Sequence, residues 1–305
     1  MATGNDSAKR ICSTNYSLRK KRDVVISRPS ATTKTITFDF GSYVHNKEHG
    51  DHTITRVKHD AKFTVNNVRT TDEIGQGSYG QVLAATWNNV PVAAKFQFIR
   101  ESQKVVKSEA MIHKIIPKWC PYFVLPQLEI RRSEVSVYIM TRYAEDLGKM
   151  LERGQVLDAH KRQLIHQVAQ SIDSLVGLNI CHLDVKPANF LVTLDMVVCL
   201  GDFGCALSGN ICRNLESRGT LGYLAPEAIR AHPYVGKVDM WSIGCVIYEI
   251  WKQSALFDET DEILSNPRYY ANSLPHVRCG SLTSIVQILI VLDTDDRSTS
   301  AQLLQ

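Results

Sequence analysis

The segment HLDVKPANF, residues 182–190, places an acid, an amine and an amide within six positions. Asp184 can accept a proton from a hydroxyl group, Lys186 can face a phosphoryl group in transfer, and Asn189 offers an amide oxygen to Mg²⁺. A further oxygen ligand, Asp202, follows the strand-like stretch VVCL in the sequence GDFG. Two oxygen ligands together with the phosphates of ATP suit Mg²⁺, which keeps several waters in protein sites. These residue types indicate transfer of a phosphoryl group to a hydroxyl group.

A glycine-rich stretch, GQGSYGQV, holds Gly75, Gly77 and Gly80 in the spacing GxGxxG. The same spacing occurs in dinucleotide-binding turns, where the glycines open a helix. Here residues 81–83 continue with β-type sequence, which favours a turn between two strands. Because glycine has no side chain beyond hydrogen, such a turn allows backbone N–H groups to approach phosphate oxygens.

An amine that could reach the same phosphates lies fifteen residues past Gly80, where VAAK ends at Lys95. Lys95 alone would also fit a surface lysine on an edge strand. Its place ahead of an acidic helical segment favours a buried ion pair instead. Glu109 is the expected carboxylate partner, with Glu101 as the alternative.

The hydrophobic patterns predict a β-rich first part and a helical second part. Five strands are expected, two of them within residues 68–87 and the others in 90–98, 123–130 and 135–143. A helix is expected over 101–116, before Pro117. Apolar residues at helical spacing predict a helix over 159–180, and the stretch 238–251, apolar on nearly every side, predicts a buried helix.

These motifs, with LAPE at 224–227, resemble in type and order the signature set of eukaryotic-type protein kinases, over residues 68–305. The resemblance implies an α+β bilobal fold, with a small antiparallel β-sheet lobe that carries one helix and a larger, mainly helical lobe. It divides the chain into a kinase domain at 66–305 and a flexible, basic extension at 1–65. Within the domain the expected N-lobe is 66–141, the connector 142–147 and the C-lobe 148–305.

The resemblance also assigns roles. Asp184 would be the catalytic base, Lys186 would face the transferring phosphoryl group, and Asn189 and Asp202 would hold Mg²⁺. The implied contacts to ATP are Ile74, Gly75, Gly77, Gly80, Val82, Lys95, Glu109, Tyr143 and Ala144. The alignment places Thr141 at the back of the nucleotide pocket. Three further residues resemble structural positions of the family: Asp239, which would hold the catalytic loop, and Arg297, which would pair with Glu227.

The expected substrates are serine and threonine hydroxyls of proteins, because DVKPAN and GTLGYLAPE resemble Ser/Thr rather than tyrosine kinases; Thr220 would contact Asp184 and Lys186. Two other readings stay open, a pseudokinase scaffold without turnover and a small-molecule phosphotransferase. Leu183 stands where such kinases usually have an arginine that binds a phosphorylated activation loop. The sequence therefore predicts an enzyme that does not require phosphorylation of Ser208 or Ser217.

The formal charge of +4 is unevenly distributed. Residues 1–35 have eight basic and two acidic side chains, whereas residues 36–305 have 27 basic and 29 acidic ones. This basic segment predicts at most weak contact with nucleic acid. The run LRKKR at 18–22 fits a nuclear-import signal or a polyanion-binding patch, and it fits an ordinary solvated basic tail equally well. No apolar run approaches the roughly 20 residues of a membrane span, so we expect an intracellular protein, cytoplasmic or nuclear, with no membrane partner. The compact core and the segment YAEDLGKML further resemble kinases of large DNA viruses, herpesvirus-like ones among them, which would place the protein in a host cell.

Overall fold

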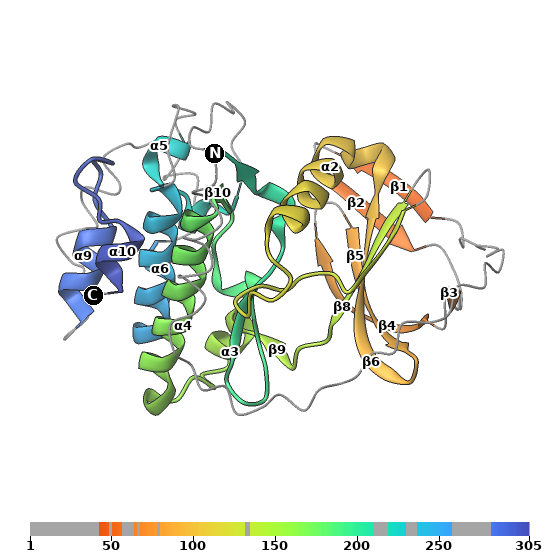
Figure 1. Ribbon diagram of the computed structural model, residues 1–305, viewed down its shortest axis with the longest axis horizontal. Coiled ribbons are helices and arrows are strands. Elements are labelled where there is room, and N and C mark those ends of the chain that lie inside the picture. Colours follow the sequence, from red (N-terminus) through yellow and green to blue (C-terminus); the bar gives the residue numbers. More distant parts are fainter. Residues whose placement is uncertain are drawn as a thin grey trace. The chain divides into compact units, whose positions relative to one another are not determined.

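The computed structural model describes residues 43–48, 51–56, 64–65, 68–77, 80–131, 135–209, 219–229, 237–257 and 282–304. These residues divide into two compact units (Figure 1). A sheet unit runs to Gln103 and includes Pro126–Arg142, and a helical unit comprises Lys104–Leu125 and Tyr143–Gln305. The two units meet between Gln103 and Lys104, within the helix that was expected over 101–116. Most of that helix therefore belongs to the helical unit.

The sheet unit is built on an antiparallel sheet with the strand order β3-β4-β5-β6-β8-β7. Five of its strands are those expected from the sequence, and the two-residue β3 is an addition. Their bounds are β3 Thr64–Val65, β4 Val68–Gly77, β5 Gly80–Trp87, β6 Val90–Phe98, β7 Leu128–Arg131 and β8 Val135–Thr141. The predicted strand at 123–130 was too long, because only its last residues pair with β8.

The two faces of this sheet differ in character, since side chains alternate along each strand. One face carries the apolar core of the unit, which includes Val92, Ala94 and Phe96 of β6 and Val137 and Ile139 of β8. Lys95 lies between these core positions in sequence and therefore on the opposite face. The register of β6 and β8 thus decides which residues share a face with Lys95.

A separate pair of strands, β1 (Tyr43–Glu48) and β2 (Asp51–Arg56), lies within residues 1–65, which were expected to form a flexible extension. The basic residues of the tail, among them the candidate import signal, lie outside the described residues.

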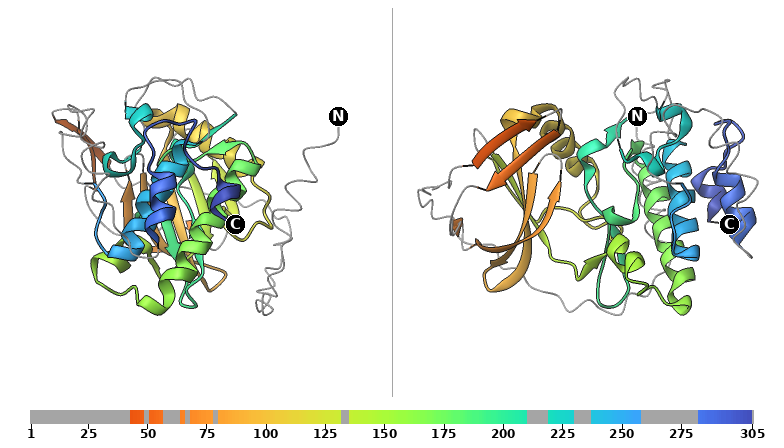
Figure 2. Two further views of the ribbon diagram at one scale, coloured as in Figure 1. Left: turned by 90° about the vertical axis from the view of Figure 1, so that its left-hand side faces the viewer. Right: turned by 180° about the vertical axis from the view of Figure 1, so that it is seen from behind.

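The helical unit contains the end of α2 (Ile99–Ile115) and the helices α3 (Leu147–Glu152), α4 (Asp158–Gly177), α5 (Pro226–Ile229), α6 (Val238–Lys252), α9 (Thr283–Leu289) and α10 (Ser300–Leu303). α4 and α6 lie side by side in both Figure 1 and Figure 2. The predicted helices at 159–180 and 238–251 are confirmed, and the first ends earlier than expected. Its end has a local cause, because Asn179 adopts a left-handed conformation with φ 54°.

Short strands in this unit position the loops that carry the candidate catalytic residues. β10 (Ile180–Cys181) pairs with β13 (Leu207–Ser208). A three-stranded sheet has the order β12-β11-β9, with β9 Glu145–Asp146, β11 Phe190–Val192 and β12 Val198–Leu200. The loop 182–189 thus runs from β10 to β11, and the loop 201–206 runs from β12 to β13. The pairing of these strands holds the two loops beside each other.

The architecture confirms the predicted fold class, an α+β chain with an antiparallel sheet part and a mainly helical part. Among the helices of the described residues, none has both the length and the apolar character that crossing a membrane requires.

Candidate active site

The loop between β10 and β11 gathers the predicted catalytic groups around one carboxylate. Thr220 Oγ1 donates a hydrogen bond of 2.8 Å to Asp184 Oδ1. Lys186 Nζ lies 3.1 Å from Asp184 Oδ2 and 2.6 Å from Thr220 Oγ1. The Asp184 side chain is only 14% exposed, so these contacts act where water screens them little. Asp184, Lys186 and Thr220 therefore form one linked group, as the resemblance implied.

Asn189 completes this group from the other end of the loop. Its Nδ2 donates to the backbone oxygen of Asp184 at 2.7 Å and to Asp184 Oδ2 at 3.1 Å. Both contacts use the amide nitrogen, so the amide oxygen is the atom presented to a cation.

Asp202, the second predicted metal ligand, lies in the loop that follows β12 and is exposed. Its neighbour Gly201 donates a backbone hydrogen bond of 2.8 Å to Asn189 O. The backbone segments of Asp202 and Asn189 are thereby joined. A carboxylate and an amide oxygen from adjoining segments are a donor set that suits Mg²⁺ with additional phosphate and water ligands.

The catalytic loop is anchored by Asp239 at the start of α6. The backbone N–H groups of His182 and Leu183 donate to Asp239 Oδ2 and Oδ1 at 2.6 and 2.9 Å. Asp239 is fully buried, which raises its pKa, and the two N–H donors work in the opposite direction. The role that the resemblance assigned to this aspartate is matched by its contacts.

The contacts of His182 hold the catalytic loop in place. Its Nε2 lies 3.0 Å from Gly201 O, and the N–H of Asp184 points to its Nδ1 at 3.3 Å. These contacts fit the neutral tautomer with its proton on Nε2. The ring also packs edge-on against Phe203, 5.2 Å between centroids, which ties the loop of Asp184 to the loop of Asp202.

Leu183, which replaces the usual arginine, is buried and has a positive φ of 66°. Such a conformation is strained for a leucine, and the hydrogen bond to Asp239 maintains it. Gly219 faces it: a Cβ at Gly219 would lie 2.3 Å from Leu183 O, and Gly219 itself has φ 103°. Only glycine fits there, so the backbone of Gly219 packs directly on the loop that carries Asp184.

Glu109 is nearly fully buried on α2, and the Nε2 of His113 lies 3.8 Å from its carboxylate. Ser108 donates a hydrogen bond of 2.9 Å to Ala206 O, which links α2 to the segment after Asp202. The pairing of Lys95 with Glu109 joins residues of different units and stays a prediction. The side chain of the alternative, Glu101, lies outside the described residues.

In the sheet unit the register places several predicted ATP contacts in one row. Gly75 pairs with Val82 of β5, Val82 with Lys95 of β6, and Lys95 with Tyr138 of β8. Gly77 pairs with Gly80, so the glycine motif does form a turn between strands rather than the start of a helix. The half-exposed Ile74 precedes this row on β4.

Gly80 has a steric reason to be glycine. A Cβ at this position would lie 1.8 Å from Phe96 O, so any side chain would push β5 away from β6. At Gly75 the nearest atom to such a Cβ is 3.7 Å away, an ordinary contact.

The prediction for Thr141 requires a correction. Met140 pairs with Ala93 and shares the face of Lys95, whereas Thr141 pairs with Val92 on the opposite face. Thr141 Oγ1 accepts a hydrogen bond of 2.9 Å from Gln127. A shift of one residue moves a side chain to the other face of a sheet, and here the alignment missed by one position. Met140, which the sequence analysis did not name, is therefore the better candidate for that position.

Tyr143 and Ala144, the two connector residues expected to contact ATP, have different surroundings. Burial and, to a lesser extent, the neighbouring Cys199 thiol raise the pKa of the Tyr143 hydroxyl, which is therefore neutral. The N–H of Ala144 already donates to Val192 O at 3.1 Å. The backbone of Tyr143 is thus a better candidate for contact with adenine than the N–H of Ala144.

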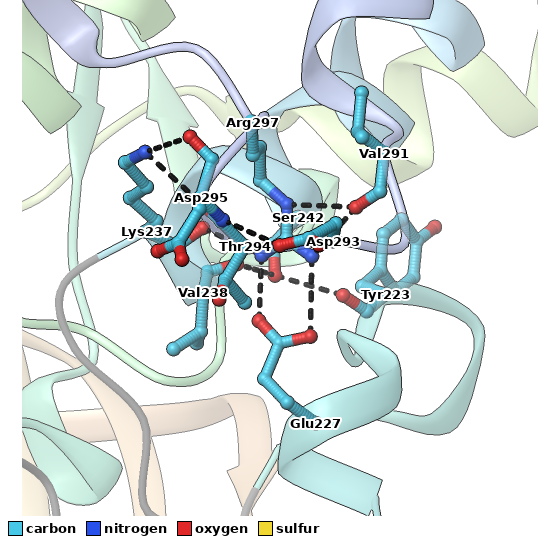
Figure 3. Close-up of polar contacts among 10 residues, drawn as sticks. All are labelled: Tyr223, Glu227, Lys237, Val238, Ser242, Val291, Asp293, Thr294, Asp295 and Arg297. Carbon is cyan, nitrogen blue, oxygen red and sulfur yellow. Dashed lines mark hydrogen bonds and ion pairs between the residues drawn. The ribbon is translucent and has the colours of Figure 1, made fainter.

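Arg297 and Glu227 form the ion pair that the resemblance predicted (Figure 3). Two parallel contacts of 2.6 and 3.1 Å join the guanidinium to the carboxylate. Arg297 also donates to Lys237 O and Val291 O and is buried, so its polar atoms are well satisfied. This pair holds the segment after Thr220 against α6 and the loop at 291–297.

The antiparallel sheet with its glycine hairpin and the catalytic loop of acid, lysine and asparagine together have the architecture of a protein kinase. The family model described as the protein kinase domain matches residues 68–305, and the chain belongs to this family.

Several curated proteins are similar to this chain. Aurora kinase C of Mus musculus is 30% identical over 203 residues, which cover 62% of this chain and 71% of that protein. Mitogen-activated protein kinase 13 of Arabidopsis thaliana is 28% identical, with 68% of this chain and 66% of that protein covered. Serine/threonine-protein kinase PKH1 of Saccharomyces cerevisiae is 24% identical over 81% of this chain. The chain spans only 36% of the length of PKH1.

Proposed function

We propose that the chain is a serine/threonine protein kinase that transfers the γ-phosphoryl group of ATP to protein hydroxyls. The observation that carries the proposal is the set of contacts made by the Asp184 carboxylate. Its partners are the side chains of Thr220, Lys186 and Asn189. The relatives named as Ser/Thr kinases support the same substrate class.

In the proposed reaction the hydroxyl oxygen of the substrate bonds to the γ-phosphorus while the bond from that phosphorus to the β,γ-bridging oxygen breaks, releasing ADP. Asp184 orients the hydroxyl and takes its proton. Lys186 stabilises negative charge on the transferring group, and Lys95 binds the α- and β-phosphates. Asn189 and Asp202 would hold Mg²⁺, which neutralises phosphate charge when bound.

Phosphorylation of the activation loop is not required in this proposal. The position that would present a guanidinium to a loop phosphate holds the buried, aliphatic Leu183. Gly219, next to Thr220, instead packs closely on the backbone of Leu183. Of the two candidate modification sites, Ser217 lies outside the described residues and Ser208 is exposed.

The alternative of a scaffold without turnover is weaker. Such a protein has no need of a carboxylate with these contacts. It would typically lack the lysine, the base or a metal ligand, whereas this chain has Lys95, Asp184, Asn189 and Asp202. A small-molecule phosphotransferase would not need the GTLGYLAPE segment, which the Arg297–Glu227 pair holds in place.

The test is a phosphorylation assay with ³²P-labelled ATP on arrayed Ser, Thr and Tyr peptides, with Asp184→Asn as the matched inactive variant. We expect label on serine and threonine from the wild type and a loss of at least about a hundredfold in the variant. Equal signal from both proteins would refute the proposal, and label only on tyrosine would refute the substrate class.

The location is also part of the proposal: the cytoplasm or nucleus, of a host cell if the chain is viral. The basic run at 18–22 supports a nuclear address. A reporter fused to residues 1–35 should enter the nucleus, and a variant with 18–22 neutralised should not.

A further inference from the structure

Lys237, the residue immediately before α6, is joined to the loop at 291–297 by three hydrogen bonds (Figure 3). Its Nζ donates to the backbone oxygens of Thr294 and Asp295, each at a distance of 3.0 Å. Its own backbone oxygen accepts a hydrogen bond of 2.9 Å from Nη1 of Arg297. The start of α6 and this loop therefore hold each other, and the loop ends at the arginine that forms the buried ion pair.

Arg297 uses all of its hydrogen-bonding capacity in this place. A guanidinium has five N–H groups, and the side chain of Arg297 makes five hydrogen bonds to Glu227, Val291 and Lys237. This side chain has no exposed surface, and its Cζ lies 5.3 Å from the centre of the Trp241 ring. Because such a guanidinium cannot follow a shift of the loop without losing bonds, the position of the loop decides where Glu227 is held.

The loop that carries Arg297 is acidic. Asp293, Asp295 and Asp296 lie within four positions and are all exposed. The N–H of Asp295 donates to Oδ1 of Asp293 at 2.9 Å, which forms a local turn. Carboxylates so close together repel each other, and the ammonium of Lys237 brings the opposite charge to them. Lys237 therefore acts on the loop in two ways, by its two donated hydrogen bonds and by its charge.

Of these two effects, the hydrogen bonds are the larger. Water screens charges between exposed groups, and surface ion pairs contribute little as a result. The contacts of Lys237 join a charged donor to two main-chain oxygens, and charge-assisted hydrogen bonds are about twice as strong as neutral ones. The geometry of the loop thus depends on the donors of Lys237.

Glu227, the carboxylate that the guanidinium holds, belongs to the segment that follows Thr220. The same segment is fixed on α6 at Tyr223, whose backbone oxygen accepts a hydrogen bond of 2.7 Å from Ser242. Tyr223 also donates from its hydroxyl to Glu249 at 2.7 Å. These contacts determine how the segment lies beside the proposed catalytic base, since Thr220 is hydrogen-bonded to that base.

We propose that Lys237 is a positioning residue for the segment that presents the protein substrate to Asp184. Lys237 acts through Arg297: it fixes the loop, the loop places the guanidinium, and the guanidinium holds Glu227. The inference rests on the proposed kinase function, because it concerns how a protein substrate is received. Loss of the Lys237 donors should weaken binding of the protein substrate and leave binding of ATP unchanged.

The test compares two substitutions of Lys237. Lys237→Met keeps the aliphatic stem and removes the donors, whereas Lys237→Arg keeps a cationic donor. With a serine peptide that the wild type phosphorylates, Lys237→Met should raise KM for the peptide at least about fivefold and leave KM for ATP within about twofold. Lys237→Arg should restore KM for the peptide to within about twofold of the wild type. The matched control is Lys252→Met at the exposed other end of α6, which should change neither constant.

A further variant separates hydrogen bonding from charge. Asp295→Asn together with Asp296→Asn removes two negative charges and leaves the main-chain oxygens in place. This variant should keep KM for the peptide within about twofold of the wild type. A rise as large as that of Lys237→Met would show that the balance of charge, and not the hydrogen bonds of Lys237, controls the segment, and would overturn the proposal.

Hydrogen–deuterium exchange provides a readout that needs no turnover. In Lys237→Met the backbone amides of 221–229 should exchange faster than in the wild type, while those of 182–192 should be unchanged. A wild type that phosphorylates no peptide would refute the proposed function. Faster exchange in 221–229 would then still support the role of Lys237 in holding the segment, and unchanged exchange would refute that role as well.

Three kinetic results would also overturn the proposal. These are a peptide KM that Lys237→Met leaves unchanged, equal rises in KM for peptide and ATP, or a Lys237→Arg variant as impaired as Lys237→Met. Because Lys237 is half-buried, each variant should remain folded, and thermal unfolding checks this. The kinetic comparison is made at a temperature at which every variant is folded.

Discussion

The hydroxyl of Thr220 donates its hydrogen bond to Oδ1 of Asp184, while Lys186 contacts both residues. Thr220 precedes LGYLAPE, the segment held by Arg297, and Asp184 belongs to the loop held by Asp239. The one hydrogen bond therefore joins two separately anchored segments at the proposed catalytic base. Its removal should affect catalysis more than folding.

Thr220→Val replaces the hydroxyl with a methyl group of similar shape. We expect kcat to fall about tenfold to a hundredfold, because a hydrogen bond to a charged group contributes about 1.5–3 kcal/mol. Thr220→Ser keeps the hydroxyl and should retain most of the activity. Steady-state kinetics of both variants provide the check; a Val variant as active as the Ser variant would contradict the role given to this bond.

The anchoring of the catalytic loop predicts a stability effect at Asp239. Asp239→Ala removes the acceptor of two backbone N–H groups in a buried place, and each such group left unsatisfied costs about 1–3 kcal/mol. The free energy of unfolding should fall by about 3 kcal/mol in denaturant titrations. Asp173→Ala, a partly exposed aspartate on α4, is the control and should change it by less than about 0.5 kcal/mol. Equal effects of the two changes would argue against the anchor.

The glycine hairpin offers a paired test of sterics. Gly80→Ala forces a side-chain carbon against Phe96 O and should destabilise the sheet unit by about 1–3 kcal/mol, as overpacking does. Gly75→Ala has room for its methyl group and should cost less than about 1 kcal/mol. Chemical unfolding of both variants, compared with that of the wild type, provides the measurement. A smaller effect at Gly80 than at Gly75 would contradict the register of β5 and β6.

The correction at Met140 leads to a prediction about nucleotide affinity. Met140→Trp adds bulk on the face that carries Lys95 and should raise KM for ATP about tenfold. Thr141→Trp adds the same bulk on the other face and should change KM for ATP far less. Initial rates over a range of ATP concentrations distinguish the two, and the reverse order would restore Thr141 to the nucleotide pocket.

The elements that the sequence predicted best are α4 and α6. Many apolar residues at helical spacing indicated one buried face of α4, and a long stretch that is apolar on nearly every side indicated the buried helix α6. Features that depend on contacts between distant segments were harder to predict. The alignment placed Thr141 one residue from the correct position, since register is decided by pairing with β6 rather than by the strand itself. The candidate catalytic residues could be named from the sequence because their chemistry is visible in residue type and order. The closure of Gly219 onto Leu183 could not be predicted, because both residues lack a polar group that would reveal it.

Leu183 provides the test of regulation. The chain should be active when it is made in bacteria and stripped of phosphate with a broad-specificity phosphatase, because packing of Gly219 on Leu183, rather than a phosphate, holds Gly219 and Thr220 beside Asp184. Leu183→Arg introduces a guanidinium at a buried position and should lower the free energy of unfolding by several kcal/mol. Leu183→Met keeps the apolar volume and should cost less than about 1.5 kcal/mol, with activity retained. Mass spectrometry confirms that the treated protein carries no phosphate before it is assayed. An inactive dephosphorylated enzyme that regains activity when Ser208 or Ser217 is phosphorylated would refute independence from loop phosphorylation.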